Sequence, residues 1–179
     1  MTKVIYMDLG RCIYCRACEV ACEREHGGIS HMFVQLIDEC YAVPMNCRHC
    51  EVSPCTLICP TKAVHRETED AVTVDTMKCI GCKLCTLACP FGVIWPDLFN
   101  KVSRKCDLCL HRTRQGLDPA CVATCSARAL AYGEFGDIIA SVQTKPATTL
   151  INRAAGKVGT VVTMPWFSQG PPAGNSRGR

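Results

Sequence analysis

The sequence predicts a small α+β protein that is organised around cysteine side chains, and three observations support this. Cysteine supplies 17 of the 179 residues, while the aromatic residues are only five Phe, four Tyr and two Trp. Sixteen of the cysteines fall into four regularly spaced groups, and short β-branched runs alternate with these groups. A conventional core of large apolar side chains would therefore be thin, and the cysteines must supply part of the stability.

Short strands and helical turns are expected around the cysteine groups. The β-branched runs KVIYMD (3–8), AVTVDT (71–76) and ALAYGE (129–134) predict strands. A helical turn is expected after the third cysteine of a group, as in TLAC (86–89). Since the first and third cysteine groups share one pattern, the sequence indicates an internal duplication of one α+β unit.

The cysteine groups have similar spacing. The first and third groups read C-x2-C-x2-C-x3-C, and proline follows the second and third groups. In the fourth group, an insertion of 11 residues separates the first two cysteines from the last two. The groups are Cys12, Cys15, Cys18 and Cys22; Cys47, Cys50, Cys55 and Cys59; Cys79, Cys82, Cys85 and Cys89; and Cys106, Cys109, Cys121 and Cys125.

This spacing suits cubane iron–sulfur clusters. A C-x2-C-x2-C loop points three thiolates at three iron corners, and the following cysteine ligates the other cluster of a pair. Zinc also uses C-x2-C pairs but requires no third cysteine in the loop, and a disulfide framework would suit a secreted domain. Cys40 stands outside the groups. We expect it to be a buried thiol, with a role as a replacement ligand as the alternative.

The motifs CIGCKLCTLACPFGVI, KCDLC and ARALAYGEFGD resemble the four-cluster ferredoxin-like electron-transfer subunits. Such subunits accompany molybdenum or tungsten oxidoreductases, such as formate dehydrogenase and aldehyde oxidoreductase, and also some hydrogenases and carbon monoxide dehydrogenase. The resemblance implies tandem bacterial ferredoxin-like modules, the second inserted in the first. It places the outer module at residues 1–45 plus 96–136, the inserted module at 46–95, and a C-terminal docking tail at 137–179 with a flexible end of about 12 residues.

The resemblance also implies which cysteines share a cluster, because in that family the first group pairs with the fourth and the second with the third. The four sets are Cys12, Cys15, Cys18 and Cys125; Cys22, Cys106, Cys109 and Cys121; Cys47, Cys50, Cys55 and Cys89; and Cys59, Cys79, Cys82 and Cys85. Every position is cysteine, so four [4Fe–4S] clusters are expected.

Basic side chains near the ligands would offset the charge of the clusters, which is roughly −2 for an oxidised cubane with four thiolates. The candidates are Arg11, Arg16, Arg48, Lys78, Lys83, Arg104 and Lys105. Gly81 and Gly92 are expected to let the backbone approach closely. The five histidines do not cluster along the sequence, although His49 and His111 are expected to tune or pack against the sites.

The chain lacks a P-loop, a G-x-G-x-x-G motif and a nucleophile–base pair. We therefore expect no catalysis by the isolated chain. It would relay electrons between a catalytic oxidoreductase subunit and a second redox partner, in anaerobic metabolism. The alternatives are a free-standing polyferredoxin, which exchanges electrons with several enzymes, and an iron–sulfur assembly protein, which passes clusters on.

The C-terminal region differs from the rest in charge. Residues 138–179 contain no Asp or Glu but five basic residues, which are Lys145, Arg153, Lys157, Arg177 and Arg179. Helix is predicted at 137–143 and 147–159, and an apolar strand-like end at 158–167. This composition indicates docking to the catalytic subunit or to another copy, which would build filaments, with wrapping around its own core as the alternative.

No nucleic-acid motif accompanies the basic residues, so binding to nucleic acid is not expected. No run approaches the ~20 apolar residues of a membrane-spanning helix. The first residues, MTKVIYMDLGRC, lack the apolar region and cleavage site of a signal peptide. The expected location is therefore the cytoplasm.

Overall fold

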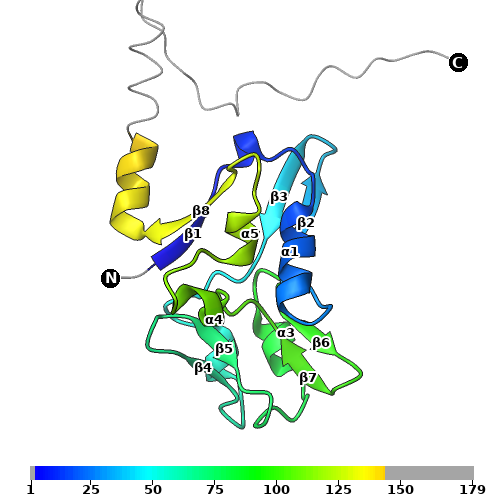
Figure 1. Ribbon diagram of the computed structural model, residues 1–179. Helices are drawn as coiled ribbons and strands as arrows, with labels where there is room; N and C mark the ends of the chain where they lie inside the picture. The colour runs from blue at the N-terminus through cyan, green and yellow to red at the C-terminus, as the bar shows by residue number, and fades with distance from the viewer. Residues whose placement is uncertain (1–2, 144–179) are drawn as a thin grey trace, which may run out of the picture. The chain divides into compact units, whose positions relative to one another are not determined.

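The computed structural model describes residues 3–143, and the boundary between its two compact units follows Phe135 (Figure 1). In the first unit, short helices alternate with strand pairs. The elements in order are β1 (Lys3–Met7), η1 (Leu9–Arg11), α1 (Ala17–Glu25), β2 (Phe33–Ile37), β3 (Tyr41–Met45), α2 (Pro54–Leu57), β4 (Val64–Arg66), β5 (Val72–Val74), α3 (Leu84–Ala88), β6 (Trp95–Asp97), β7 (Val102–Arg104), α4 (Leu110–Thr113), α5 (Ala120–Ala123) and β8 (Leu130–Glu134).

The strands of the first unit pair two by two and antiparallel. Three pairs are local hairpins, β2–β3, β4–β5 and β6–β7. The fourth pair joins the two ends of the unit, because β1 lies beside β8 with Lys3 opposite Glu134 and Met7 opposite Leu130 (Figure 1). The first and last strands therefore close the unit around the hairpins between them.

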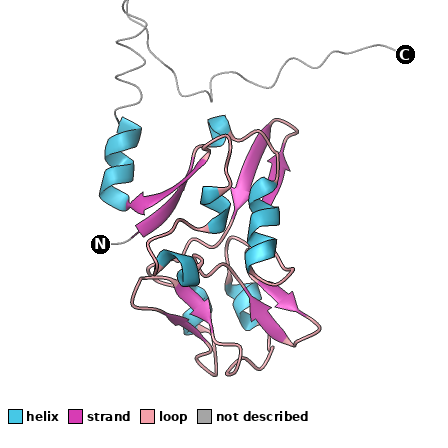
Figure 2. Cartoon of the chain, in the orientation of Figure 1, coloured by secondary structure: helices cyan, strands magenta, loops and turns pink. Residues whose placement is uncertain are grey.

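The mixture of short helices and small antiparallel sheets confirms the predicted α+β class (Figure 2). The strands predicted at 3–8, 71–76 and 129–134 correspond to β1, β5 and β8. Helix α3 begins at Leu84, two residues before the predicted turn. Residues 135–143 are helical, as predicted for 137–143, and the helix and strand expected beyond residue 146 lie outside the described residues.

Cysteines are part of the buried core, which consists largely of two apolar clusters. The first contains Cys18, Cys22 and Cys121, packed with Met32, Val34, Ala42 and Leu130. The second contains Cys55 and Cys85, packed with Val64, Val72 and Ile94. Helix α1 contacts α5 in the first half, and α2 contacts α3 in the second. Each cluster thus combines cysteines from two groups that are distant in sequence.

Cys40 corrects one prediction, because it is exposed and not buried. The strand-like run around it is interrupted by the turn of the β2–β3 hairpin. Asp38 and Glu39 adopt left-handed backbone conformations there, with φ of 49° and 55°. The turn therefore directs this thiol to the surface.

Within residues 3–143, no helix has the length and apolarity to cross a membrane.

Candidate iron–sulfur sites

The 17 cysteines all lie within the described residues, and all of them are free thiols. The disulfide framework considered as an alternative is therefore not formed. Seven cysteines are buried, which are Cys18, Cys22, Cys55, Cys85, Cys106, Cys109 and Cys121, whereas Cys15, Cys40 and Cys82 are exposed. Seven thiols thus lie in the interior, where a free cysteine acts only as a small apolar group unless it has a ligand role.

One cavity is lined by the four cysteines Cys12, Cys15, Cys18 and Cys125. Its other walls are mostly apolar and include Val34, Pro44 and Leu130. The backbone turns sharply between Cys15 and α1, because Tyr14 and Arg16 both adopt left-handed conformations. This turn brings Cys18, on the first turn of α1, to the same cavity as the preceding two cysteines.

A second cavity is lined by Cys47, Cys50, Cys55 and Cys89. Val72, Val93 and Ile94 form apolar walls around it. Helix α2 begins with Pro54, and the hydroxyl of Ser53 donates a hydrogen bond to the carbonyl of Cys50 at 2.5 Å. Proline suits the first turn of a helix because no intrahelical partner is needed for its nitrogen. The loop and the helix therefore place Cys50 and Cys55 at one site.

The other two predicted sets stay predictions. The first apolar cluster contains cysteines of groups one and four, and the second contains cysteines of groups two and three. Burial, together with the nearby Cys109 and Cys22, raises the pKa of Cys121 to about 12. Burial likewise raises the pKa of Cys18 to about 11. A bound metal would reverse this, because ligation requires the thiolate.

Backbone N–H groups donate hydrogen bonds to four of the sulfurs. The pairs are His31 N to Cys22 Sγ at 3.2 Å, Ala129 N to Cys125 Sγ at 3.2 Å, His49 N to Cys47 Sγ at 3.4 Å, and Leu108 N to Cys106 Sγ at 3.4 Å. Hydrogen bonds of this type favour the charged thiolate over the thiol. The donor set, with sulfur ligands and N–H groups around cavities, fits an iron–sulfur cluster.

The two glycines singled out in the sequence differ from each other. Gly81 has a φ of +67°, and a Cβ placed there would lie 2.2 Å from the carbonyl oxygen of Lys101. The predicted approach of the backbone to the cluster sulfurs stays a prediction for both glycines, because the close neighbour of Gly81 is a carbonyl of the β6–β7 turn. Gly92 has a φ of +61°, and a Cβ added there would meet no atom within 4 Å. The positive φ of Gly92 suits a tight turn.

A group of histidines beside Cys22 was missed in the sequence. His26 Nδ1 lies 2.8 Å from the Cys22 carbonyl oxygen, and Nε2 lies 3.0 Å from Asp107 Oδ1. Because Asp107 and Cys22 both accept, the pKa of His26 is raised to about 11 and the ring is an imidazolium. The His31 ring lies 4.2 Å away. His26, His31 and Asp107 could approach one metal ion, but both His26 nitrogens are already engaged in these hydrogen bonds.

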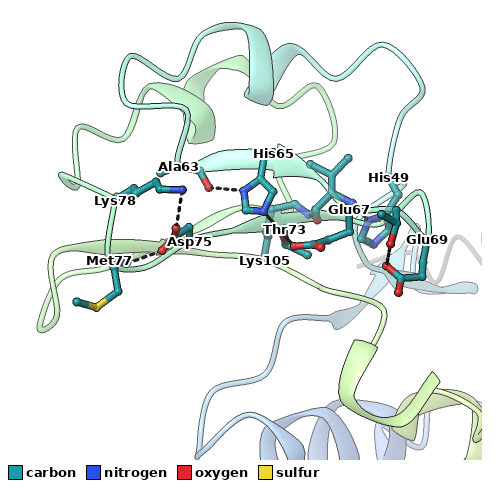
Figure 3. A network of polar contacts seen from close by, with 12 residues as sticks. His49, Ala63, His65, Glu67, Glu69, Thr73, Asp75, Met77, Lys78 and Lys105 are labelled. Atoms are coloured by element: carbon teal, nitrogen blue, oxygen red, sulfur yellow. Dashed lines mark hydrogen bonds and ion pairs between the residues drawn. The ribbon is translucent and has the colours of Figure 1, made fainter. Parts of the chain in front are cut away.

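A polar network surrounds the β4–β5 hairpin (Figure 3). His65 bonds to Ala63 O and, at 3.0 Å, to the carboxylate of Glu67, which also accepts from the Thr73 hydroxyl at 3.2 Å. At the end of the hairpin, Asp75 pairs with Lys78 at 3.2 Å. These contacts hold the hairpin that supports the wall residue Val72.

Free cysteines gathered at apolar cavities, in groups with cubane spacing, define an iron–sulfur protein. The profile of the family described as "4Fe-4S dicluster domain" matches residues 38–135, which is more than half of the chain. The chain therefore belongs to the 4Fe-4S dicluster domain family.

Several relatives are redox subunits. The chain is similar to the thiosulfate reductase electron transfer subunit PhsB of Salmonella typhi, with 37% identity over 147 residues, covering 75% of this chain and 77% of the relative. It is also similar to one chain of the anaerobic dimethyl sulfoxide reductase of Escherichia coli, with 32% identity and 74% of each protein covered. One subunit of the tetrathionate reductase of Salmonella typhimurium is 33% identical over 73% of this chain and 57% of its own length.

Proposed function

We propose that this chain is the electron-transfer subunit of an oxidoreductase complex, in which four [4Fe–4S] clusters relay electrons between a catalytic subunit and a second redox partner. The observation that supports this most strongly is the pair of cavities. Each is lined by the four cysteines that the resemblance assigned to one cluster. Membership of the 4Fe-4S family and the electron-transfer relatives point the same way.

The ligands of the four clusters follow from the same pairing. We assign them as Cys12, Cys15, Cys18 and Cys125; Cys22, Cys106, Cys109 and Cys121; Cys47, Cys50, Cys55 and Cys89; and Cys59, Cys79, Cys82 and Cys85. One apolar cluster joins cysteines of groups one and four and the other joins groups two and three, which supports the pairing of the groups. The nested modules, 46–95 inside 1–45 plus 96–136, are supported by the β1–β8 pair, which encloses the intervening hairpins.

When bound, the clusters supply one-electron chemistry, and the protein holds and insulates them. Apolar walls such as Val34 and Val72 exclude water from the cavities. Cys15 and Cys82 are the exposed members of two different sets. Electron exchange with a partner is favoured at such exposed edges because tunnelling weakens steeply with distance. With each iron held by cysteine, no position is left for substrate, so the chain itself is non-catalytic.

The partner is an oxidoreductase, and the relatives favour one class. The three named relatives belong to reductases of thiosulfate, dimethyl sulfoxide and tetrathionate, which are all oxidised sulfur compounds. We propose a catalytic subunit of that class, in the cytoplasm, in preference to the formate, aldehyde, hydrogen and carbon monoxide enzymes suggested by the sequence. Filament formation through the tail stays a prediction, as does the flexible end.

Iron analysis of the anaerobically purified chain tests the proposal. About sixteen Fe and sixteen sulfide per chain are expected from four cubanes. Cys55→Ser should lose about four Fe, whereas Cys40→Ser, at an exposed cysteine outside all sets, should lose none. A colourless folded wild-type chain, or equal iron loss in both variants, would contradict the assignment. Co-purification with one catalytic subunit would distinguish a dedicated subunit from a free polyferredoxin.

A further inference from the structure

Lys105 differs from the other basic residues expected beside the ligands, because it is buried. Five of those seven side chains are exposed and Arg104 is half-buried, but Lys105 is only 3% exposed. Its ammonium group donates hydrogen bonds to the carbonyl oxygens of Val72 and, at 3.0 Å, of Cys106. Among the ion pairs of the described residues, none includes Lys105.

A buried cation without an anion is costly. Removing an ammonium group from water costs several kcal/mol, and carbonyl hydrogen bonds satisfy its protons without neutralising its charge. A negative group nearby would compensate for this cost. Since no carboxylate of the described residues pairs with this ammonium, the arrangement points to anionic sulfur.

Both contacts of Lys105 lead to proposed ligands. Cys106 is the next residue in the chain, and Val72 packs in one apolar cluster with Cys55. Val72 also lines the cavity of Cys47, Cys50, Cys55 and Cys89. The ammonium therefore lies near cysteines of two different sets, one from each half of the first unit.

We propose that Lys105 is the shared counter-charge of two neighbouring clusters, the one held by the Cys55 set and the one held by the Cys106 set, and that it raises the midpoint potential of both. Reduction adds one electron to a cluster that is already anionic, and a fixed positive charge in a low-dielectric interior stabilises the reduced form. Lys105 takes up no proton in this step. The inference rests on the proposed function, because it requires that the clusters are bound.

The chain offers a matched control in Lys78. Lys78 precedes Cys79 just as Lys105 precedes Cys106, but its side chain is 63% exposed and pairs with Asp75 at 3.2 Å. Water and the carboxylate screen this charge, so its removal should change no potential appreciably. A comparison of the two lysines therefore separates burial from mere proximity in sequence.

The experiment is a redox titration followed by electron paramagnetic resonance on the full chain. The variants are Lys105→Met, which removes the charge, Lys105→Gln, which keeps N–H donors for the two carbonyls, Lys105→Arg, which keeps the charge, and Lys78→Met. In the two neutral Lys105 variants, the reduced-to-oxidised ratio at a fixed potential should fall about tenfold for two of the four clusters, which equals about 59 mV for one electron. The potentials of the other two clusters should be unchanged in these variants. In Lys105→Arg and Lys78→Met, all four potentials should match those of the wild type.

The outcomes separate this inference from the proposed function. A wild-type chain with far fewer than about sixteen Fe would refute the proposed function itself. A fully loaded wild type whose neutral Lys105 variants titrate normally would refute only the role of Lys105. A shift in Lys105→Arg as large as in Lys105→Met would refute it too, because packing would then be the cause. Loss of two clusters in both neutral variants, with Lys105→Arg fully loaded, would support it.

Discussion

Replacing Gly81 with alanine should disrupt the loop of the third cysteine group. The left-handed backbone at φ +67° costs an L-residue about 1–2 kcal/mol. The added Cβ would also lie 2.2 Å from the Lys101 carbonyl oxygen, whereas ordinary contact begins at 3.4 Å. The turn would have to move by roughly 1 Å, and such overpacking costs about 1–3 kcal/mol. The total loss is therefore about 2–5 kcal/mol.

Gly92→Ala is the matched control, because its φ of +61° carries the same backbone cost without any contact within 4 Å. The assay is the thermal midpoint of the iron-loaded chain, followed by visible absorbance, together with iron content. For a unit of this size, the Gly81 variant should melt about 5–15 °C below the wild type and lose iron from the neighbouring cluster, and the Gly92 variant should fall by only a few degrees. Equal melting of the two variants would refute the reasoning.

Three further predictions concern the polar groups and the metal. Cys85 Sγ lies 3.1 Å from Ser103 Oγ in the interior, and a hydroxyl bonded to a cluster sulfur stabilises the reduced cluster. Ser103→Ala should therefore lower the potential of the Cys85 cluster by on the order of 40 mV, which is equivalent to about 1 kcal/mol. An unchanged redox titration would contradict this prediction. Bonds from Asn100 hold the pKa of Asp97 below its usual range, so the stabilisation by this carboxylate is complete above about pH 3.9 and is lost as pH falls further. Asp97→Asn should therefore lose iron faster than the wild type at about pH 7. In a pH-jump measurement, the difference between the two rates of iron loss should shrink below about pH 4, and a difference that grew there would contradict the prediction. Chelating the iron should unfold the chain, because ligation and folding are coupled, and a cooperative melt of the iron-free chain by circular dichroism would count against this.

Local sequence patterns predicted much of this molecule because cysteine ligation is encoded at short spacing. The loops around Cys12 and Cys47 each bring three cysteines together within a few residues. The strands and the helix after a third cysteine were likewise predicted from short runs of sequence. Contacts that depend on tertiary packing could not be predicted in this way. Asp107 lies 81 residues from His26, so no local pattern indicated their ion pair.

Other features depended on burial and turn geometry. In the sequence, Lys105 cannot be told apart from the six other basic residues near the ligands. Only the fold shows that its side chain is buried and bonded to the Val72 carbonyl. Cys40 was expected inside because it lies in a strand-like run, yet two consecutive left-handed residues form a hairpin turn there. A β-branched or apolar neighbourhood thus predicted strands well but did not predict where they reverse.

The pairing of β1 with β8 also has a consequence for biosynthesis. Lys3 leaves the ribosome long before its partner Glu134, which lies near the end of the first unit. The local hairpins β2–β3 and β4–β5 can form while translation continues, but the outer ladder must wait for its second strand. In the proposed ligand set, Cys12, Cys15 and Cys18 therefore wait for Cys125, so this cluster can be completed only after the inserted module has been synthesised.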